Sequence, residues 1–331
     1  MPLHSIPNQF QLESGKILQG ARIYYEVLGE ISLNKEVVWI CHAFTGSATV
    51  KDWWPSLFHE NGGFIKADKH VVVCANILGS CYGSTGPDAI NPQTGKVYGN
   101  DFPELKNRDV IKALIDLRKA LHISKINYLI GGSMGGQQAL EWSLFEPEVI
   151  LNQILIASNA KHSAWGIAFN ELQRQALAIG LNDSDEDRQK SLALARSIAM
   201  VSYRSYSDFE KNQAGKNVNA EWNVTSYLNY QGKKFIGRFN SHSYIILSKM
   251  LDSHDITEIR EGTIKDILAT IKAKTLCIGI DSDILFPLEE QKFLSENIPY
   301  AKLEVIESLK GHDAFLIEGN LISDFIEKYF T

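Results

Sequence analysis

The sequence predicts an α/β fold with a mostly parallel central sheet, helices on both faces and a helical insertion late in the chain. Two observations and one general rule lead to this prediction. Short apolar runs rich in β-branched residues alternate with stretches of helical periodicity over residues 36–157. The alternation stops between residues 161 and 258, where helical stretches follow one another, and then resumes. Strands that alternate with helices form parallel sheets that are covered on both sides.

Composition and charge narrow the function classes. Of 331 residues, 44% are hydrophobic and 22% are charged, as in a globular chain with a sizeable core. The net charge of −6 argues against nucleic-acid binding, which needs clustered lysines and arginines. No apolar run is long enough to span a bilayer, and the first residues lack the pattern of a secretory signal. We therefore expect a cytoplasmic protein with no membrane or nucleic-acid partner.

The four cysteines predict free thiols in a reducing compartment. They are Cys41, Cys74, Cys81 and Cys277, and none forms a C-x-x-C pair. Three of them lie in or beside apolar runs that are typical of buried strands. Disulfides and a metal site are therefore not expected.

The first half of the chain carries most of the expected strands. They are a loosely alternating stretch at 16–28 and apolar runs at 36–41, 69–76, 125–130 and 152–157. Continuous apolar runs are typical of strands that are buried on both faces. Between them, apolar side chains recur on one helical face over 108–121, and a second helix is expected from about 137 to 145.

The second half begins with the insertion and returns to the α/β rhythm. Helical stretches are expected at 164–180, 188–201, 221–231 and 241–251. Strands follow at 275–280 and 302–306, with helices at 288–297 and toward residue 330. We divide the chain into the first part of the core (1–160), a helical lid insertion (161–258) and the second part of the core (259–331). An insertion at this point of the fold is expected to cover the carboxyl edge of the sheet.

One strand-to-helix connection carries a Gly-x-Ser-x-Gly pattern, formed by Gly131, Ser133 and Gly135. The pattern alone is weak, because a glycine-rich connection can contain an incidental serine. Placed between a strand and a helix, it is typical of the nucleophile elbow of the α/β-hydrolase fold. There a sharp turn points the serine side chain out of the sheet, and the glycines avoid clashes with the strand and the helix.

Partners for the serine follow in the expected order. A serine hydroxyl needs a base to take its proton, and that base must be oriented by an acid. In this fold the acid and then the histidine follow late strands. Asp281 and Asp283 come after the penultimate strand, and His312 comes after the last one. Of nine histidines, only His312 has this order and position, whereas spacing leaves the choice between the two aspartates open.

Two backbone N–H groups are expected to face the developing oxyanion. One belongs to Met134, directly after the serine at the start of a helix. The other is expected in the loop after an early strand, residues 42–46, where Phe44 is the candidate.

Longer strings around these residues give the sequence a resemblance to a known family. They lie at 42–46, 83–87, 90–95, 131–136, 139–142, 169–175, 202–205, 230–235, 238–239, 282–287 and 311–315. With them the chain resembles, over nearly its whole length, the homoserine O-acetyltransferase family, which are α/β-hydrolase-fold acyltransferases of methionine biosynthesis. The resemblance implies a nucleophile at Ser133, a base at His312 and, in place of the open choice, an orienting acid at Asp283.

The same resemblance implies that Arg204, Tyr230 and Asp313 help to hold an amino-acid acceptor. A guanidinium suits the acceptor's carboxylate, and a carboxylate beside the catalytic histidine suits its ammonium group. From the residues alone, Arg204 would be interpreted as part of a lid salt bridge and Asp313 as a helix cap.

The implied activity is transfer of an acetyl group from acetyl-CoA to homoserine through an acyl-serine, by a ping-pong mechanism. Acetyl-CoA is then a co-substrate, with no permanently bound cofactor and no metal, and a homodimer assembled through the lid is implied. A succinyl donor or a serine acceptor remains open, because Gln137 and Phe44 stand where the family usually has Met and Leu. A serine esterase or thioesterase, or a non-catalytic binding protein on the same fold, also remains open.

A small basic cluster in the insertion, formed by Lys233, Lys234 and Arg238, has two interpretations. It can be a solvated helix face, or it can attract the phosphates of coenzyme A.

Overall fold

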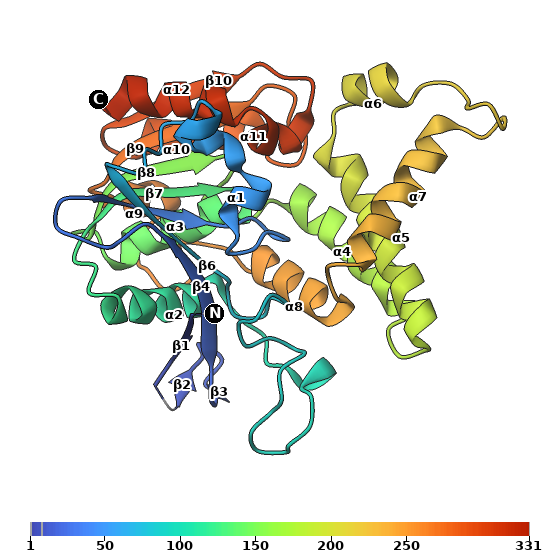
Figure 1. Ribbon diagram of the computed structural model, residues 1–331, viewed down its shortest axis with the longest axis horizontal. Coiled ribbons are helices and arrows are strands. Elements are labelled where there is room, and N and C mark those ends of the chain that lie inside the picture. Colours follow the sequence, from blue (N-terminus) through green and yellow to red (C-terminus); the bar gives the residue numbers. More distant parts are fainter. Residues whose placement is uncertain (1, 8, 331) are drawn as a thin grey trace.

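The computed structural model describes residues 2–7 and 9–330 and is built around an eight-stranded sheet (Figure 1). The strand order is β1 (Leu3–Ser5), β4 (Arg22–Leu28), β6 (His70–Ala75), β5 (Glu36–Cys41), β7 (Ile126–Gly132), β8 (Ile150–Ile156), β9 (Lys274–Ile280) and β10 (Ala301–Ile306). In this order, every pair of neighbouring strands from β6 to β10 is parallel. Strand β4 pairs antiparallel with both of its neighbours, β1 and β6. A two-stranded ribbon of β2 (Phe10–Gln11) and β3 (Ile17–Leu18) lies outside this sheet. The predicted mostly parallel sheet is therefore present.

Helices cover both faces of the sheet because alternate strand residues point to opposite sides. On one face, α2 (Asn107–Ala120), α3 (Met134–Phe145) and α10 (Leu288–Asn297) pack in one apolar cluster. On the other face, α1 (Val50–Trp53) and α12 (Gly319–Phe330) pack in a second cluster. Neighbouring residues of β5 show the division, since Val38 belongs to the second cluster and Trp39 to the first. The Trp39 ring meets Trp142 of α3 edge-on, with centroids 4.9 Å apart.

The insertion consists of α4 (Ala164–Ala178), α5 (Asp185–Tyr203), α6 (Tyr206–Gln213), α7 (Asn223–Ile236) and α8 (Ser241–Asp252). The periodicity of the sequence did not predict α6. In Figure 1, α4 to α7 stand away from the sheet, and α8 returns toward it. Four helices of the insertion begin with an N-cap side chain that accepts a hydrogen bond from the backbone N–H of the third helical residue. These N-cap residues are Ser163, Ser184, Ser205 and Asn240.

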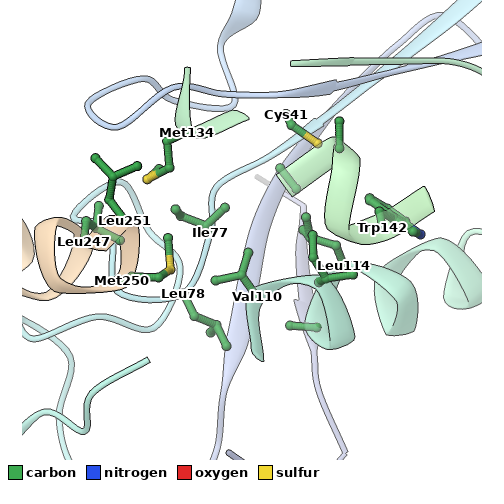
Figure 2. Close-up of a cluster of buried hydrophobic side chains, with 14 of the residues drawn as sticks. Cys41, Ile77, Leu78, Val110, Leu114, Met134, Trp142, Leu247, Met250 and Leu251 are labelled. Carbon is green, nitrogen blue, oxygen red and sulfur yellow. The ribbon is translucent and has the colours of Figure 1, made fainter. Parts of the chain in front are cut away.

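Both ends of the insertion are tied together at its base. The amide of His162 donates to the carbonyl of His254 over 2.8 Å, and Lys161 pairs with Asp255 at 2.8 Å. Figure 2 shows that Leu247, Met250 and Leu251 of α8 pack beside Ile77 and Met134 in the main core. The insertion is thus anchored by α8 and by its stem. Two short helices, α9 (Ile264–Leu268) and α11 (Ala314–Ile317), lie outside the insertion.

Within residues 2–7 and 9–330, each helix is either too short or too polar to cross a membrane. The four cysteines are free thiols, three of them buried and Cys81 partly so.

Candidate active site

Ser133 lies in a sharp turn between β7 and α3. Its backbone φ is +57° and ψ is −126°, a conformation that is strained for a residue with a side chain. The turn brings the chain so close to itself that two neighbours must lack a Cβ. A Cβ on Gly131 would lie 2.0 Å from the carbonyl oxygen of Gly135, and a Cβ on Gly135 would lie 2.1 Å from that of Cys41. The predicted strand–turn–helix geometry of the nucleophile elbow is therefore present.

Two late loops bring an acid and a base to this serine. The Nε2 atom of His312 lies 2.8 Å from Ser133 Oγ, and its Nδ1 lies 2.6 Å from Asp283 Oδ2. All three side chains are buried, with exposed fractions of 7% or less. An ionised carboxylate accepts only, so Nδ1 donates to Asp283 and Nε2 is left to accept the serine proton.

The environment of Asp283 explains why it takes this place. Its Oδ1 accepts the backbone amides of Leu285 and Phe286 at 2.8 and 2.9 Å, which fixes the carboxylate in the loop after β9. Asp281 is exposed, and its Oδ1 accepts the amide of Ser308 at 3.0 Å. The geometry therefore joins Asp283, and not Asp281, to the histidine.

Aromatic rings hold the imidazole of His312 in this orientation. The Phe286 ring stacks on it with centroids 5.0 Å apart and planes 18° apart. Phe315 meets it edge-on at 5.4 Å, and Tyr203 of α5 lies 6.0 Å away. The histidine is thus fixed by packing as well as by its hydrogen bonds.

The two predicted oxyanion donors, Met134 and Phe44, each have a backbone amide close to Ser133 in the fold that lacks an acceptor among the described residues. Met134 is the first residue of α3, where a backbone N–H has no partner in its own helix and the helix dipole favours negative charge. Phe44 follows β5 in the loop of residues 42–46. Within residues 2–7 and 9–330, neither amide has a hydrogen-bond acceptor, so both remain available for a ligand.

His42 orders the loop that contains Phe44. Burial lowers the pKa of His42 to about 4, so its imidazole is neutral. Its Nε2 accepts the amide of Ile77 at 3.3 Å, which leaves Nδ1 to donate to the carbonyl of Ala43 over 2.8 Å. The same carbonyl accepts the amide of Gly46 at 2.9 Å. The Ala43 carbonyl and the Phe44 N–H belong to one peptide group, so these two hydrogen bonds also fix the orientation of the Phe44 N–H.

A cavity of about 820 Å³ opens above the serine, a size typical of small-molecule sites. Of the residues predicted from the sequence, Ser133, His312, Phe44 and Asp313 line it. The lid contributes the side chains of Arg196, Tyr203, Lys234 and Arg238.

The structure does not bring Arg204 or Tyr230 to this cavity. Arg204 Nε lies 3.0 Å from Asp313 Oδ2, and its Nη1 lies 3.5 Å from Asp208, so its charge is already matched. Tyr230 is 60% exposed on α7. Burial raises the pKa of Asp313, whereas the positive charge of Arg204 opposes that rise.

Arg196 is a cavity residue that the sequence reasoning missed. Its guanidinium packs over the rings of Tyr203 and Phe235 at 5.3 and 5.0 Å. In the part of the chain that the structure describes, no carboxylate pairs with it. A signal was available, since Arg196 interrupts an apolar helical stretch two turns before Tyr203, on the same face.

Comparisons with known proteins show which family the chain belongs to. The family model described as "alpha/beta hydrolase fold" matches residues 36–318. A homoserine O-acetyltransferase of Cyclobacterium marinum is 44% identical over 327 residues, which cover 96% of this chain and 92% of the relative. The chain belongs to the homoserine O-acetyltransferase family.

Solved structures support the family and the fold. A homoserine O-acetyltransferase from Staphylococcus aureus has a TM-score of 0.83 at 28% identity, covering 100% of this chain and 96% of that one. Esterase E22 has a TM-score of 0.88 at 22% identity, covering 100% of this chain and 99% of that one. At that identity, the likeness to the esterase shows the fold alone. The predicted α/β-hydrolase fold is confirmed.

The side chain of Gln137, which was expected near the acyl pocket, lies outside the cavity lining. It is 1% exposed, and its Nε2 donates to Asn159 Oδ1 over 2.9 Å. The Nδ2 atom of Asn159 in turn donates to Glu290 Oε2 over 3.0 Å. Gln137 therefore belongs to a buried polar chain behind the triad and does not contact the cavity.

Glu290 in the first turn of α10 ends this polar chain. Burial raises its pKa to about 7, and the negative charge of Asp283 adds to the rise, while Asn159 and His312 oppose it. Sequence reasoning had no signal for this residue, because its isolation follows from how α10 packs. Among residues 2–7 and 9–330, no group of three or more His, Cys, Asp and Glu side chains could hold a metal ion.

The raised pKa of Glu290 predicts a pH-dependent loss of stability. Below its unfolded pKa of 4.5 the carboxyl is protonated in both states and carries no penalty. The penalty grows as pH rises and is complete above about pH 7, where it reaches about 3 kcal/mol. We expect Glu290→Gln to raise the free energy of unfolding, relative to wild type, more at about pH 8 than at about pH 5.

Denaturant unfolding of both proteins at the two pH values measures this difference. Glu289→Gln, at the exposed neighbouring position, is the matched control and should show a difference that does not change with pH. A Glu290→Gln effect that is equal at both pH values would contradict the prediction.

Proposed function

We propose that the chain transfers an acetyl group from acetyl-CoA to the hydroxyl of homoserine by a ping-pong mechanism. The observation that carries the proposal is the hydrogen-bonded series from Asp283 through His312 to Ser133 at the base of a lidded cavity. A chain of this family with that arrangement has what acyl transfer needs: an activated nucleophile, donors for an oxyanion and room for two substrates in turn.

In the first half-reaction, His312 takes the proton of Ser133 as Oγ attacks the thioester carbonyl. The amides of Phe44 and Met134 stabilise the negative charge on the tetrahedral carbonyl oxygen. When the carbon–sulfur bond breaks, His312 returns the proton to the departing sulfur. Coenzyme A leaves as a thiol, and an ester on Ser133 remains.

In the second half-reaction, His312 takes the proton of the homoserine hydroxyl, and its oxygen attacks the acyl-serine. Collapse of the intermediate releases O-acetylhomoserine and returns the proton to Ser133. The resident groups perform every proton transfer, so the proposal needs no metal and no permanently bound cofactor. The lid must exclude water at this stage, since an acyl-serine open to solvent is hydrolysed.

We assign the acceptor contacts from the cavity lining. Arg196 lines the cavity and has no carboxylate partner among the described residues, and we propose that it binds the acceptor's carboxylate. Asp313 would face the ammonium group, with Arg204 acting as its positioning partner. The sequence-based role of Arg204 in direct binding is replaced by this arrangement, and a contact from Tyr230 would need a rearrangement of α7.

Competing functions share the triad and differ in substrates. Succinyl transfer, a serine acceptor and simple hydrolysis use the same chemical steps. A non-catalytic binding role leaves the hydrogen-bonded triad unexplained. We further propose a cytoplasmic location in a reducing environment, which the four free thiols favour.

A donor-by-acceptor activity matrix tests the proposal. Acetyl-CoA and succinyl-CoA are each combined with homoserine, serine or no acceptor, and release of coenzyme A and the acylated product are measured. We expect acetyl-CoA with homoserine to be the fastest pair, whereas release of acetate alone would identify a hydrolase.

Asp283→Asn should lower kcat by about 10⁴-fold. The matched control Asp281→Asn, two residues away, should leave kcat unchanged, and equal losses in both variants would contradict the triad.

The assignment of Arg196 predicts a selective effect on the acceptor. Arg196→Gln should raise the KM for homoserine by about tenfold to a hundredfold, because a charge-assisted hydrogen bond is lost. Release of coenzyme A in the first turnover should keep its wild-type rate. Arg188→Gln is the control, since Arg188 lies on the same helix and pairs with Asp185 outside the cavity. An unchanged KM for homoserine in Arg196→Gln would contradict the assignment.

We also propose a homodimer assembled through the lid, which leaves large apolar side chains exposed. On α4, on α5 and at the residue that follows α4, these include Leu172, Leu194, Val201 and Ile179. Sedimentation equilibrium should give a dimer for the wild type, and Leu172→Asp or Leu194→Asp should weaken it. Leu33→Asp, at an exposed loop position outside the lid, is the control. A wild-type monomer at micromolar concentration would contradict the proposal.

A further inference from the structure

One lid side chain reaches across to the loop that carries the Phe44 amide. Arg238 follows α7, and its Nη1 donates to the carbonyl oxygen of Thr45 and to the Tyr82 hydroxyl, each over 2.8 Å. Its Nη2 lies 3.3 Å from Thr45 Oγ1. The guanidinium is also placed over the Phe235 ring at 4.9 Å. All three of these hydrogen bonds join the lid to residues outside it. Two of them go to Thr45, the residue directly after Phe44.

The same lid segment buries the side chain of Phe44. The Phe44 ring is 6% exposed and meets Tyr244 of α8 edge-on, with centroids 4.7 Å apart. Phe239, the neighbour of Arg238, lies 6.4 Å from the Phe44 ring and 5.8 Å from Tyr82. Two consecutive loop residues, Phe44 and Thr45, are thus held by one short stretch of the lid.

The loop is fixed from the other side by the core. The Ala43 carbonyl accepts hydrogen bonds from His42 and Gly46, and this carbonyl belongs to the peptide group that carries the Phe44 N–H. Contacts with the core therefore fix the peptide group before Phe44, and contacts with the lid fix the residue after it. Loss of either constraint leaves the N–H group free to rotate, because a surface loop has few other contacts to restrain it.

We propose that Arg238 is a positioning residue that keeps the Phe44 amide aimed at the oxyanion, so that the lid completes the oxyanion hole. The inference rests on the proposed acyl-serine chemistry and deepens it. Arg238 acts through Thr45 and does not touch the reacting atoms. Lysine cannot replace it, because a planar guanidinium fork reaches a carbonyl, a hydroxyl and a phenol together, whereas an ammonium is a single point.

This assignment gives Arg238 a different role from Lys233 and Lys234, the other two residues of the basic cluster. Both N–H groups of its Nη1 are already engaged by Thr45 and Tyr82, whereas Lys234 lines the cavity and makes no such contact. Lys233 is exposed and outside the cavity lining. Binding of a coenzyme A phosphate therefore falls to Lys234, and the two functions can be tested apart.

The experiment measures acylation of Ser133 with two donors that differ in charge. Acetyl-CoA carries phosphates, whereas p-nitrophenyl acetate carries none, and release of coenzyme A or p-nitrophenol reports the first half-reaction. We expect Arg238→Gln and Arg238→Lys to lower the acylation rate at saturation by about tenfold to a hundredfold with both donors. The KM for acetyl-CoA should change little. Tyr82→Phe, which removes one of the three contacts, should give a smaller loss in the same direction.

Two lysine variants provide the comparison. Lys234→Gln should raise the KM for acetyl-CoA and spare its acylation rate at saturation, and Lys233→Gln should match the wild type with both donors. Unchanged acylation in both Arg238 variants overturns the inference. So does a loss confined to the KM for acetyl-CoA, which would make Arg238 a phosphate-binding residue.

Two controls keep the outcomes distinct. Thermal unfolding identifies any variant that fails to fold, and Arg238→Lys and Tyr82→Phe then decide the result, because they retain most of the packing. If wild-type protein shows no rapid first release of coenzyme A or p-nitrophenol that depends on Ser133, the proposed function is refuted, and the inference with it. A wild-type burst that the Arg238 variants leave intact refutes the inference alone.

Discussion

The close approach of α3 to the end of β5 organises the whole site. Gly135, in the first turn of α3, packs so tightly on the Cys41 carbonyl that a Cβ would lie 2.1 Å from it. The contact places the first amide of α3 beside the loop that leaves β5. Two amides that are 90 residues apart in the sequence, those of Phe44 and Met134, therefore lie near Ser133, and Phe44 lines the same cavity as the serine. A side chain at Gly135 would separate Ser133 from the loop that carries one of the two proposed oxyanion donors.

The strain of this turn has to be balanced by the rest of the fold. A non-glycine residue at positive φ costs on the order of 1–3 kcal/mol and persists only where its surroundings determine it. Here Ser133 lies between two buried elements, since the last residues of β7 are buried and α3 is buried along most of its length. The amide of Ser133 also donates to the carbonyl of Ile156 in β8, over 2.9 Å. A rigid sheet thus holds the one backbone conformation that exposes the serine.

Much of this arrangement could be predicted from the sequence, because it depends on local patterns. The apolar runs predicted the parallel sheet, and Gly131, Ser133 and His312 stand at strand ends that the fold brings together. The choice between Asp281 and Asp283 could not be made from spacing, since both lie in one loop. It depends on which carboxylate the amides of Leu285 and Phe286 capture.

The lid was harder to predict, because its side chains act across long sequence distances. Arg204 was expected in the acceptor site, yet Asp208 and Asp313 already match its charge, and Arg196 lines the cavity instead. Arg238 illustrates the same difficulty. Its partners Thr45 and Tyr82 lie more than 150 residues earlier, so a basic residue in an exposed segment gave no sign of a link to the oxyanion loop.

The proposed role of Ser133 is to carry the acyl group between two substrates under a lid that excludes water. Its most direct test is the mass of the protein after brief mixing with acetyl-CoA and no acceptor, quenched in acid. We expect one added acetyl group, located on the peptide that contains Ser133. A second mixing with homoserine should remove that group and form O-acetylhomoserine in equal amount. A Ser133 peptide that never gains an acetyl group, or one that loses it only as free acetate, would contradict this role.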